Sequence, residues 1–349
     1  MGKKEVQTGK ASIQFAEGPQ IIGSASVVGK KEGEGPLAER FDVIEPDPMV
    51  GCDNWEEAES ALQKEAADLA IEKAGIVRSE LRYLFAGDLL GQLIATSFGT
   101  VDLELPIFGL YGACSTIGEA LCLGAMTVEA GYAEYVMSMA SSHFASAEKQ
   151  FRFPLEYGNQ RPLSTTWTVT GCGSFVLGRK GGSVRISGIT PGKIVDMGLR
   201  DSMNMGACMA PAASDTILRN FEDFGRGPED YDRIITGDLG KVGQKILLDF
   251  MKSSGYDISG RHMDCGIEIF DSESQDTHSG GSGCGCSAVV LASFILPKLE
   301  SGEWRRVLFL PTGALLSSTS YNEGRSVPGI AHGVVLESVD VRAASGGRL

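Results

Sequence analysis

An internal repeat constrains the fold of this chain more than any other feature of its sequence. The segment GIVRSELRYLFAGDLLGQ begins at Gly75, and a related segment, GRGPEDYDRIITGDLGKV, begins at Gly225. In each copy a glycine ends a helical stretch and an apolar run leads to Gly-Asp-Leu, so that Asp88 and Asp238 correspond at an offset of 150 residues. A duplicated unit predicts two halves built on one plan.

The elements on either side of these segments extend the repeat over most of the chain. For the first half the pattern predicts a strand at 21–23, a helix at 57–73, a strand at 106–108, a helix at 114–130 and strands at 135–140 and 173–177. Their counterparts in the second half are expected at 184–188, 213–221, 268–270, 283–296, 307–310 and 333–337. The fourth element of each half is a helix with almost no charged residues.

These two uncharged helices determine the layers of the fold. A helix that is apolar all round has to be buried on all sides. Strands that alternate with helices favour right-handed crossovers and mostly parallel sheets. We therefore expect an α/β fold, a five-layer α/β/α/β/α sandwich in which two pseudo-twofold-related halves, residues 12–180 and 183–338, enclose both helices. Residues 340–349 are expected to form a loose tail.

Charge and cysteine content exclude several classes of function. The chain has 31 Lys and Arg against 45 Asp and Glu, a formal net charge of −14, which has the wrong sign for a nucleic-acid partner. The apolar run at 287–296 is too short to span a bilayer, and the first residues lack the apolar segment of a signal peptide, so we expect synthesis in the cytosol. Eight cysteines without zinc-type spacing predict reduced thiols, and we expect neither a metal nor a cofactor.

The pseudo-twofold predicts where the chemistry lies. The N-termini of the two central helices should approach each other, and each brings a reactive residue, Cys114 in YGACSTIGEAL and His278 in DTHSGGSGCGCSA. A cysteine at a helix N-terminus has a lowered pKa, and a nearby histidine can stabilise its thiolate. The alternative is that Cys114 is simply one of eight buried cysteines.

Other polar residues fall in segments expected near this point. His143 follows the strand at 135–140, at the end of a parallel sheet where ligands gather, although it can equally be a loop histidine. The remaining candidates are the hydroxyl donors Ser115, Ser142 and Thr277, and the loop cations Lys149, Arg152 and Arg161. The alternative for the hydroxyls is a role in turns and caps, and for the cations an ordinary solvated surface.

The layout resembles the thiolase and β-ketoacyl synthase superfamily, in which a cysteine opens the first central helix in a G-A-C-S-type turn. More narrowly, YGACSTIGEAL, TWTVTGCGSFVLG, ITGDLGKVGQ and DTHSGGSGCGCSA resemble the stage V sporulation protein AD family of endospore-forming bacteria. The likeness runs from about Ser12 to Ser338. It implies a thiolase-like fold and a homodimer that pairs through a strand of the first half.

Two departures from the condensing enzymes bear on activity. The position of their catalytic histidine corresponds to Asp238, and that of their active-site asparagine to His278. A carboxylate opposes the negative charge that develops on a thioester oxyanion. The equivalence with Asp88 favours a structural role for Asp238, such as capping the helix that follows. Cys114 and His278 would then be vestigial or weak catalysts.

The resemblance to the sporulation family implies a binding protein. That family is associated with dipicolinic acid, pyridine-2,6-dicarboxylate, free or as its calcium chelate. Together with membrane proteins of the same sporulation system, it moves this ligand into the spore and out again at germination. The resemblance therefore implies peripheral attachment to the spore inner membrane through these partners. The expected ligand-binding residues are Cys114, His143, His278, Ser115, Ser142, Thr277, Arg152 and Asp238.

Two other functions remain as alternatives. One is a working acyltransferase with Cys114 as the acyl-accepting nucleophile and His278 or His143 as its partner. The other is an adaptor whose pocket is vestigial.

Overall fold

Ten strands form the framework of the fold, five from each half of the chain. The strands of the first half are β3 (Gln20–Gly29), β5 (Leu81–Gly87), β6 (Ile107–Gly109), β7 (Tyr135–Ser142) and β9 (Gly171–Gly178). Those of the second half are β10 (Val184–Thr190), β11 (Arg233–Thr236), β12 (His262–Asp264), β14 (Arg306–Leu310) and β17 (Gly333–Ser338). The computed structural model describes residues 6–151 and 161–339.

The two halves have the same strand order. Across the first half the strands lie in the order β6-β5-β7-β9-β3, and across the second in the order β12-β11-β14-β17-β10. Numbered along the chain, each half therefore reads 3-2-4-5-1. The halves join where β10 pairs with β3, antiparallel, with Val184 opposite Ile21. This equivalence gives the repeat in the sequence a structural counterpart.

The sheet is mixed, and the expectation of mostly parallel strands is wrong. β5 is parallel to β6 and β7, and β11 is parallel to β12 and β14. β9 is antiparallel to both β7 and β3, and β17 is antiparallel to both β14 and β10. An antiparallel neighbour is reached by a connection that stays at one end of the sheet. The alternation of helices and strands along the sequence does not reveal such a connection.

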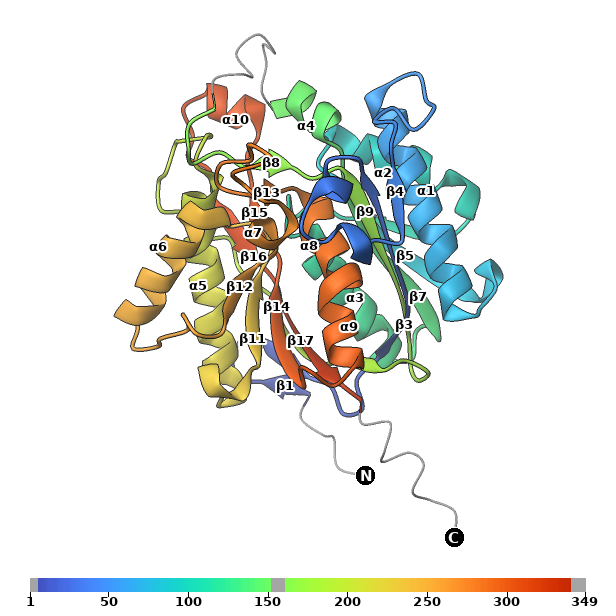
Figure 1. Cartoon of the computed structure of the whole chain (residues 1–349). Helices are drawn as coiled ribbons and strands as arrows, with labels where there is room; N and C mark the ends of the chain where they lie inside the picture. The colour runs from blue at the N-terminus through green and yellow to red at the C-terminus, as the bar shows by residue number, and fades with distance from the viewer. Residues whose placement is uncertain (1–5, 152–160, 340–349) are drawn as a thin grey trace.

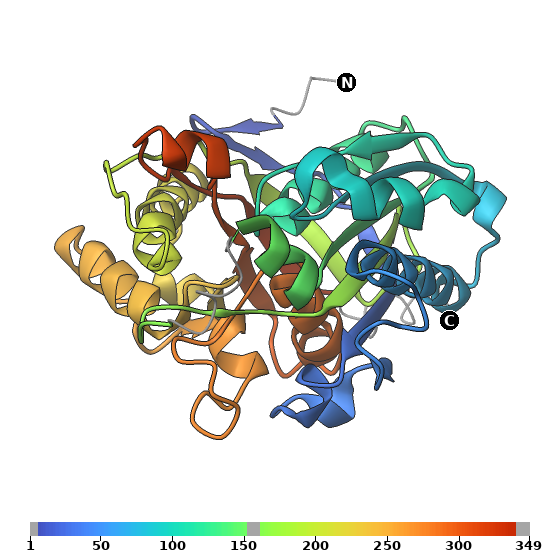
Figure 2. The same cartoon turned by 90° about the horizontal axis from the view of Figure 1, so that it is seen from above.

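The helices complete the five layers, which confirms the expected thiolase-like sandwich (Figures 1 and 2). α1 (Trp55–Ala74) covers the outer face of the first half-sheet, and α5 (Met205–Phe224) and α6 (Gly240–Ser253) cover that of the second. α3 (Thr116–Glu129) and α8 (Cys284–Val290) lie between the half-sheets. A π-helical turn at Leu291–Ile295 leads α8 into α9 (Leu296–Glu300).

Short elements fill the remaining connections. The small helices are α2 (Ile94–Gly99), α4 (Phe144–Phe151), α7 (Cys265–Ile269) and α10 (Ser318–Asn322). The small strands are β1 (Gln7–Thr8), β2 (Ser12–Gln14), β4 (Val43–Glu45), β8 (Trp167–Thr168), β13 (Gly281–Ser282), β15 (Thr312–Ala314) and β16 (Gly329–Ala331). β8 pairs with β13, and β15 with β16, in two small separate sheets.

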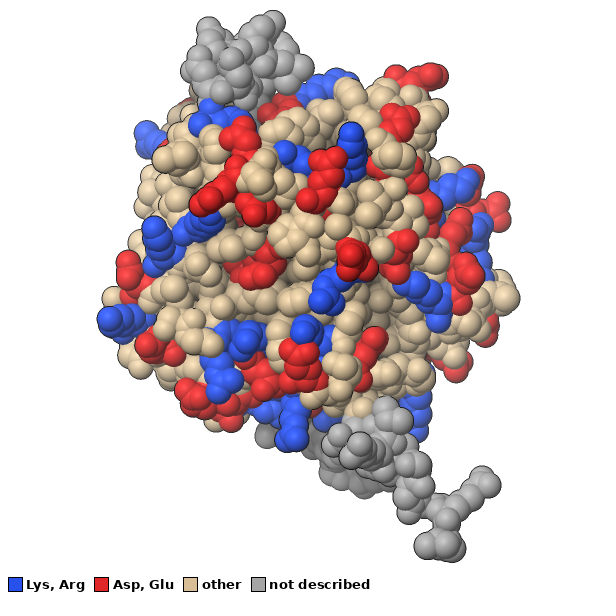
Figure 3. Space-filling model, viewed as in Figure 1, with Lys and Arg blue, Asp and Glu red and all other residues tan. Residues whose placement is uncertain are grey.

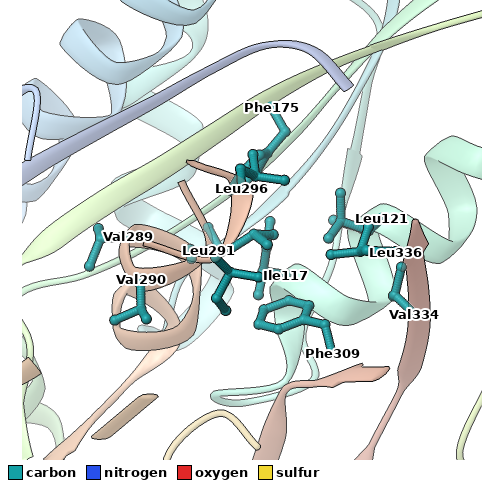
Figure 4. Close-up of a cluster of buried hydrophobic side chains, with 14 of the residues drawn as sticks. Ile117, Leu121, Phe175, Val289, Val290, Leu291, Leu296, Phe309, Val334 and Leu336 are labelled. Atoms are coloured by element: carbon teal, nitrogen blue, oxygen red, sulfur yellow. The ribbon is translucent and has the colours of Figure 1, made fainter. Parts of the chain in front are cut away.

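The core lies around the central helices. Ile117 and Leu121 of α3 point toward Phe309 of β14 and Leu336 of β17, with Leu291 of the π-helical turn beside Ile117 (Figure 4). Every residue of α8 is buried, as its lack of charge predicts. Between them these side chains contribute the large apolar area that stabilises both halves together.

The glycines at the start of the repeated segments end the outer helices. Gly75 ends α1 and Gly225 ends α5, both in the left-handed conformation, with φ of 67° and 61°. Glycine adopts this conformation without the steric cost that a Cβ atom brings. The helices begin in matching ways too, because Asn54 and Asn204 accept hydrogen bonds from backbone amides of the first turn.

One predicted strand is a helix. Residues 268–270 lie in and just after α7, and the counterpart of β6 is β12, which pairs with β11 as β6 pairs with β5. Ile269 and Phe270 are buried, so the apolar run does face the core. A short apolar run fits a strand and a buried helical turn equally well, and only the packing separates them.

Charges of both signs are interspersed over the face of the molecule seen in Figure 3. No basic patch stands out on that face. Among the described residues, none of the helices is long and apolar enough to cross a membrane.

Candidate functional site

A small cavity lies where the two halves meet, at the start of the central helices. Its volume is about 50 Å³. Its polar lining residues are Tyr111, Cys114, Glu148, Thr166, Thr168 and Ser282. Its apolar wall includes Leu89, Phe151, Met205 and Leu316. Because both halves contribute, the cavity exists only in the assembled fold.

A tight turn places Cys114 at this cavity. Ala113 has a positive φ of 49°, and Ser115 is the N-cap of α3. The hydroxyl of Ser115 donates to the carbonyl oxygen of Gly112 at 2.7 Å, and that of Thr116 donates to Ala113 O at 2.7 Å. The turn is also fixed from the other half, because the thiol of Cys284, the first residue of α8, donates to Ala113 O at 2.9 Å. The starts of the two central helices therefore do approach each other, as the sequence predicts.

The thiol of Cys114 has a raised pKa, so the expectation of a lowered pKa is wrong. Cys114 is only 7% exposed, and burial raises its pKa well above the usual range. The nearby carboxylate of Asp238 and the hydrogen bond to it raise the pKa further. α3 begins two residues after Cys114, so the favourable helix end is too weak to offset burial.

Asp238 is the polar centre of the site. It follows β11 and accepts hydrogen bonds from Gly283 N at 3.0 Å, from the hydroxyl of Thr312 at 2.8 Å and from the thiol of Cys114. Burial raises the pKa of Asp238 to about 7. The carboxyl group therefore connects β11, the start of α8 and β15, and carries a proton for part of the time at neutral pH.

Asp238 was expected to cap α6, the helix that follows it, but Asp264 does so instead. The backbone amides of Leu239 and Gly240 donate to the carboxylate of Asp264, at 2.9 and 3.0 Å, and not to Asp238. The repeat equivalent, Asp88, accepts from Leu90 N and Thr96 N at 2.7 and 2.8 Å. Asp88 thus stabilises a local turn, whereas Asp238 of the second half contacts Cys114 of the first.

His278 does not pair with Cys114. Its Nε2 lies 3.1 Å from a carboxylate oxygen of Asp276, and its Nδ1 lies 3.1 Å from Pro162 O. It is not among the residues that line the cavity, where Ser282 and Gly283 take the place expected for it. The reason is that α8 begins at Cys284, six residues beyond His278. The glycine-rich run GGSG, directly before this uncharged helix, is the sequence signal that marks the contact.

His143 follows β7 as predicted, yet its ring lies outside the cavity. Its Nε2 donates to Pro48 O at 2.8 Å, because its Nδ1 accepts from Ala145 N at 3.1 Å. Burial lowers its pKa. Both ring nitrogens are therefore occupied by the protein itself.

The predicted hydroxyl donors hold the backbone in place. Ser115 closes the turn before α3 as described above, and Ser142 donates to Val169 O at 2.7 Å and accepts from Gly285 N at 3.0 Å. Thr277 is buried, and its hydroxyl has no hydrogen-bond partner within the described ranges. These three residues are not among those lining the cavity.

Two of the three predicted cations are engaged elsewhere. Lys149 pairs with Glu56 at 2.8 Å, and Arg161 pairs with Asp276. Arg152 lies outside the described residues. Within the described part of the chain the cavity lining includes no Lys, Arg or His, and Glu148 contributes a carboxyl group.

Comparison with known proteins finds a family model and a relative that each match almost the whole chain. The family model described as "Stage V sporulation protein AD" matches residues 9–337. Stage V sporulation protein AD of Bacillus subtilis (strain 168) is 41% identical over 331 residues, which cover 95% of this chain and 97% of that protein.

Several solved structures share the fold. The 3-oxoacyl-[acyl-carrier-protein] synthase III from Aquifex aeolicus VF5 is 12% identical, with a TM-score of 0.55 over 92% of this chain and 100% of that one. A single-residue variant of OleA from Xanthomonas campestris is 15% identical, with a TM-score of 0.60 over 93% of this chain and 99% of that one. At such identities the likeness concerns the fold alone.

Proposed function

The chain belongs to the stage V sporulation protein AD family and is a sporulation protein with a thiolase-like fold, and from this premise we propose that it binds dipicolinic acid in the Cys114 cavity. The ligand would be carried as pyridine-2,6-dicarboxylate or its calcium chelate, in support of uptake into the spore and release from it. The observation that carries the proposal is the hydrogen bond between Cys114 and Asp238. Cys114 stands where the condensing enzymes have their nucleophile, and its contact with Asp238 keeps the thiol protonated and therefore less reactive.

The charges at the cavity favour the calcium chelate over the free dianion. The carboxyl group of Asp238 lies beside the thiol of Cys114, and the described residues that line the cavity include no Lys or Arg. The helix end cannot compensate, because Gly283 N is bound by Asp238 and Gly285 N by Ser142. Bringing a dianion beside the carboxyl group of Asp238 at low dielectric is costly, whereas a one-to-one chelate is neutral.

Calcium would have to arrive with the ligand. Among the described residues no group of three His, Cys, Asp or Glu side chains is placed to hold a metal ion. Calcium prefers several oxygen ligands, and the two carboxylates of dipicolinate supply part of that set.

Binding also requires the lining to open. A cavity of about 50 Å³ holds a few water molecules, less than a pyridine ring with two carboxylates needs. Ala147, Glu148 and Phe151 of α4 form one side of the cavity. A small displacement of this short helix would enlarge the site.

Calorimetry tests the proposal. Pyridine-2,6-dicarboxylate is titrated into the full chain with and without equimolar calcium, and we expect binding heat from both, with the chelate bound more tightly. Thr168→Leu, which fills the cavity, should abolish the heat, whereas Thr127→Leu on α3, away from the cavity, should not. Absence of heat from the unmodified protein with both forms of the ligand overturns the proposal.

The acyltransferase alternative has weaker support. It rests on the retained Cys114 and the shared fold, and against it stand the raised pKa of the thiol and the distant His278. Incubation with a panel of acyl-CoA thioesters, followed by intact-mass analysis, should give no adduct. An adduct that disappears in Cys114→Ala would establish the enzyme and contradict the binding role.

We propose that the protein forms a homodimer through β6. This strand ends the sheet, and all three of its residues are exposed. Ile107 and Phe108 are 44% and 51% exposed, an apolar surface at an open strand edge. Attachment to the spore inner membrane through membrane proteins of the same system is proposed on the family relationship alone.

A further inference from the structure

A second, larger cleft lies across the same strand from the Cys114 cavity. Thr166 and Thr168 line the cavity, whereas Trp167 between them lines the second cleft, as expected for side chains that alternate along an extended chain. The second cleft has a volume of about 550 Å³, in the range of small-molecule sites. We call it the aromatic cleft, lined chiefly by Lys31, Glu32, Trp55, His143, Phe144 and Trp167.

Two aromatic pairs form its walls. The rings of Phe144 and Trp167 stack with centroids 3.9 Å apart and an angle of 4° between planes. The rings of Trp55 and His143 lie 5.5 Å apart, tilted by 34°. Aromatic walls of this kind favour a planar ring, which gains both apolar burial and ring–ring contact.

A buried carboxyl group in the cleft lacks one partner. Glu32 is 1% exposed, and its Oε1 accepts from Thr170 N at 2.9 Å. Its Oε2 is buried and has no hydrogen-bond partner among the described residues. A buried acceptor left without a donor is costly, so each such group calls for an explanation. A ligand with an N–H or O–H group would supply the missing donor.

Positive charge lies at the same cleft. Lys30 is exposed and lies 3.9 Å from Glu34, a weak surface pairing. Lys31 is half-buried; its Nζ lies 4.4 Å from the centre of the Trp167 ring and donates to Gln275 O at 2.6 Å. An ammonium group bound only to a carbonyl keeps its net charge and can still attract an anion.

We propose that the aromatic cleft binds a planar aromatic carboxylate that also carries an N–H or O–H donor. The ring lies against the two aromatic pairs, the carboxylate faces Lys30 and Lys31, and the donor bonds to Oε2 of Glu32. His143 contributes only a wall, because both of its nitrogens are occupied. The proposal is independent of what the Cys114 cavity binds, and dipicolinate, which lacks such a donor, should bind here weakly.

Fluorine NMR with a defined probe tests the site. The chain has three tryptophans, and Trp304 packs against Phe294 and Arg233, outside the cleft. The full protein is labelled with 5-fluorotryptophan, assigned by single Trp→Phe variants, and titrated with indole-3-carboxylate. We expect the signals of Trp55 and Trp167 to shift together and that of Trp304 to stay. No shift of the first two signals, or an equal shift of all three, overturns the proposal.

A matched pair of probes tests the role of Glu32. 1-Methylindole-3-carboxylate has the same ring and charge but no N–H donor, so it should bind about tenfold more weakly. Glu32→Gln replaces the unpaired acceptor by a donor and should remove this difference, whereas Glu39→Gln, an exposed residue outside the cleft, should preserve it. Equal binding of both probes to the unmodified protein contradicts the assignment, and this comparison stands even if Glu32→Gln fails to fold.

Discussion

The carboxyl group of Asp238 and the thiol of Cys114 are hydrogen-bonded to each other across the boundary between the two halves. Asp238 follows β11 of the second half, and Cys114 precedes α3 of the first. Burial raises the pKa of both groups, and the carboxylate of Asp238 raises that of the Cys114 thiol further. A thiol enzyme needs a thiolate as its nucleophile. Because this pair keeps the thiol of Cys114 protonated, the site differs from the active site of such an enzyme.

Removing the charge of Asp238 should make Cys114 more reactive. In Asp238→Asn the carboxylate no longer raises the thiol pKa, and one unit of decrease means about tenfold more thiolate at a given pH. Alkylation by iodoacetamide at about pH 8, followed by peptide mass spectrometry, measures the rate. Cys52, which is half-buried and remote in sequence, serves as the internal reference. An unchanged ratio of the two rates would contradict the coupling.

The same variant should change how stability depends on pH. Asp238 has a pKa of about 7 in the folded protein against an ordinary 3.8, so between these values the folded state holds a proton that the unfolded state has released. This contribution to stability is complete below about pH 4, falls as pH rises, and is gone above about pH 7, at no more than about 1.4 kcal/mol per pH unit. Urea unfolding should show this slope in the difference between wild type and Asp238→Asn. A difference that is flat from about pH 4 to 7 would refute it.

His278→Ala should leave ligand binding at the Cys114 cavity unchanged. The His278 ring pairs with Asp276 and Pro162 O and is absent from the cavity lining. Calorimetry with the calcium chelate of dipicolinate should give an affinity within about twofold of wild type, because no direct contact is lost. A tenfold loss would show that the loop moves to the ligand and that the original expectation for His278 was right.

α8 packs so closely against β9 that a methyl group added at the contact should destabilise the fold. A Cβ atom at Gly173 of β9 would lie 2.5 Å from the carbonyl carbon of Ala288. Gly173→Ala should therefore cost about 1–3 kcal/mol in the free energy of unfolding, since helix or strand must shift. Gly260→Ala is the matched control, because a Cβ there meets nothing within 4 Å. Equal midpoints of thermal unfolding would refute the tight packing.

A charge on the edge strand should prevent dimer formation. Ile107→Glu places a carboxylate on exposed β6, where the partner strand would pair. Sedimentation velocity should show a dimer for wild type and a monomer for this variant. Tyr132→Glu, at a residue 72% exposed outside that edge, should remain dimeric. A monomeric wild type would refute the proposed dimer.

Much of the architecture could be predicted from local patterns. The repeat around Gly75 and Gly225 pointed to two equivalent helix ends, and both glycines adopt the same left-handed conformation. The uncharged segments predicted two central helices, because a helix without a polar face has no stable place at a surface. The direction of β9 and β17 and the identity of α7 could not be predicted, because they depend on neighbours distant in sequence.

The candidate site, like the architecture, could be predicted from the sequence only in part. The position of Cys114 in a tight turn at the start of a central helix is a local property, so the sequence by itself determined it, along with the duplicated halves and the buried helices. Which groups meet the thiol was decided only by the tertiary structure. Asp238 reaches Cys114, and His278 does not, because α8 begins at Cys284, and no local pattern sets where one half places its turns against the other. The pKa values depend on burial and on charges brought together through space, so they too are properties of the assembled fold.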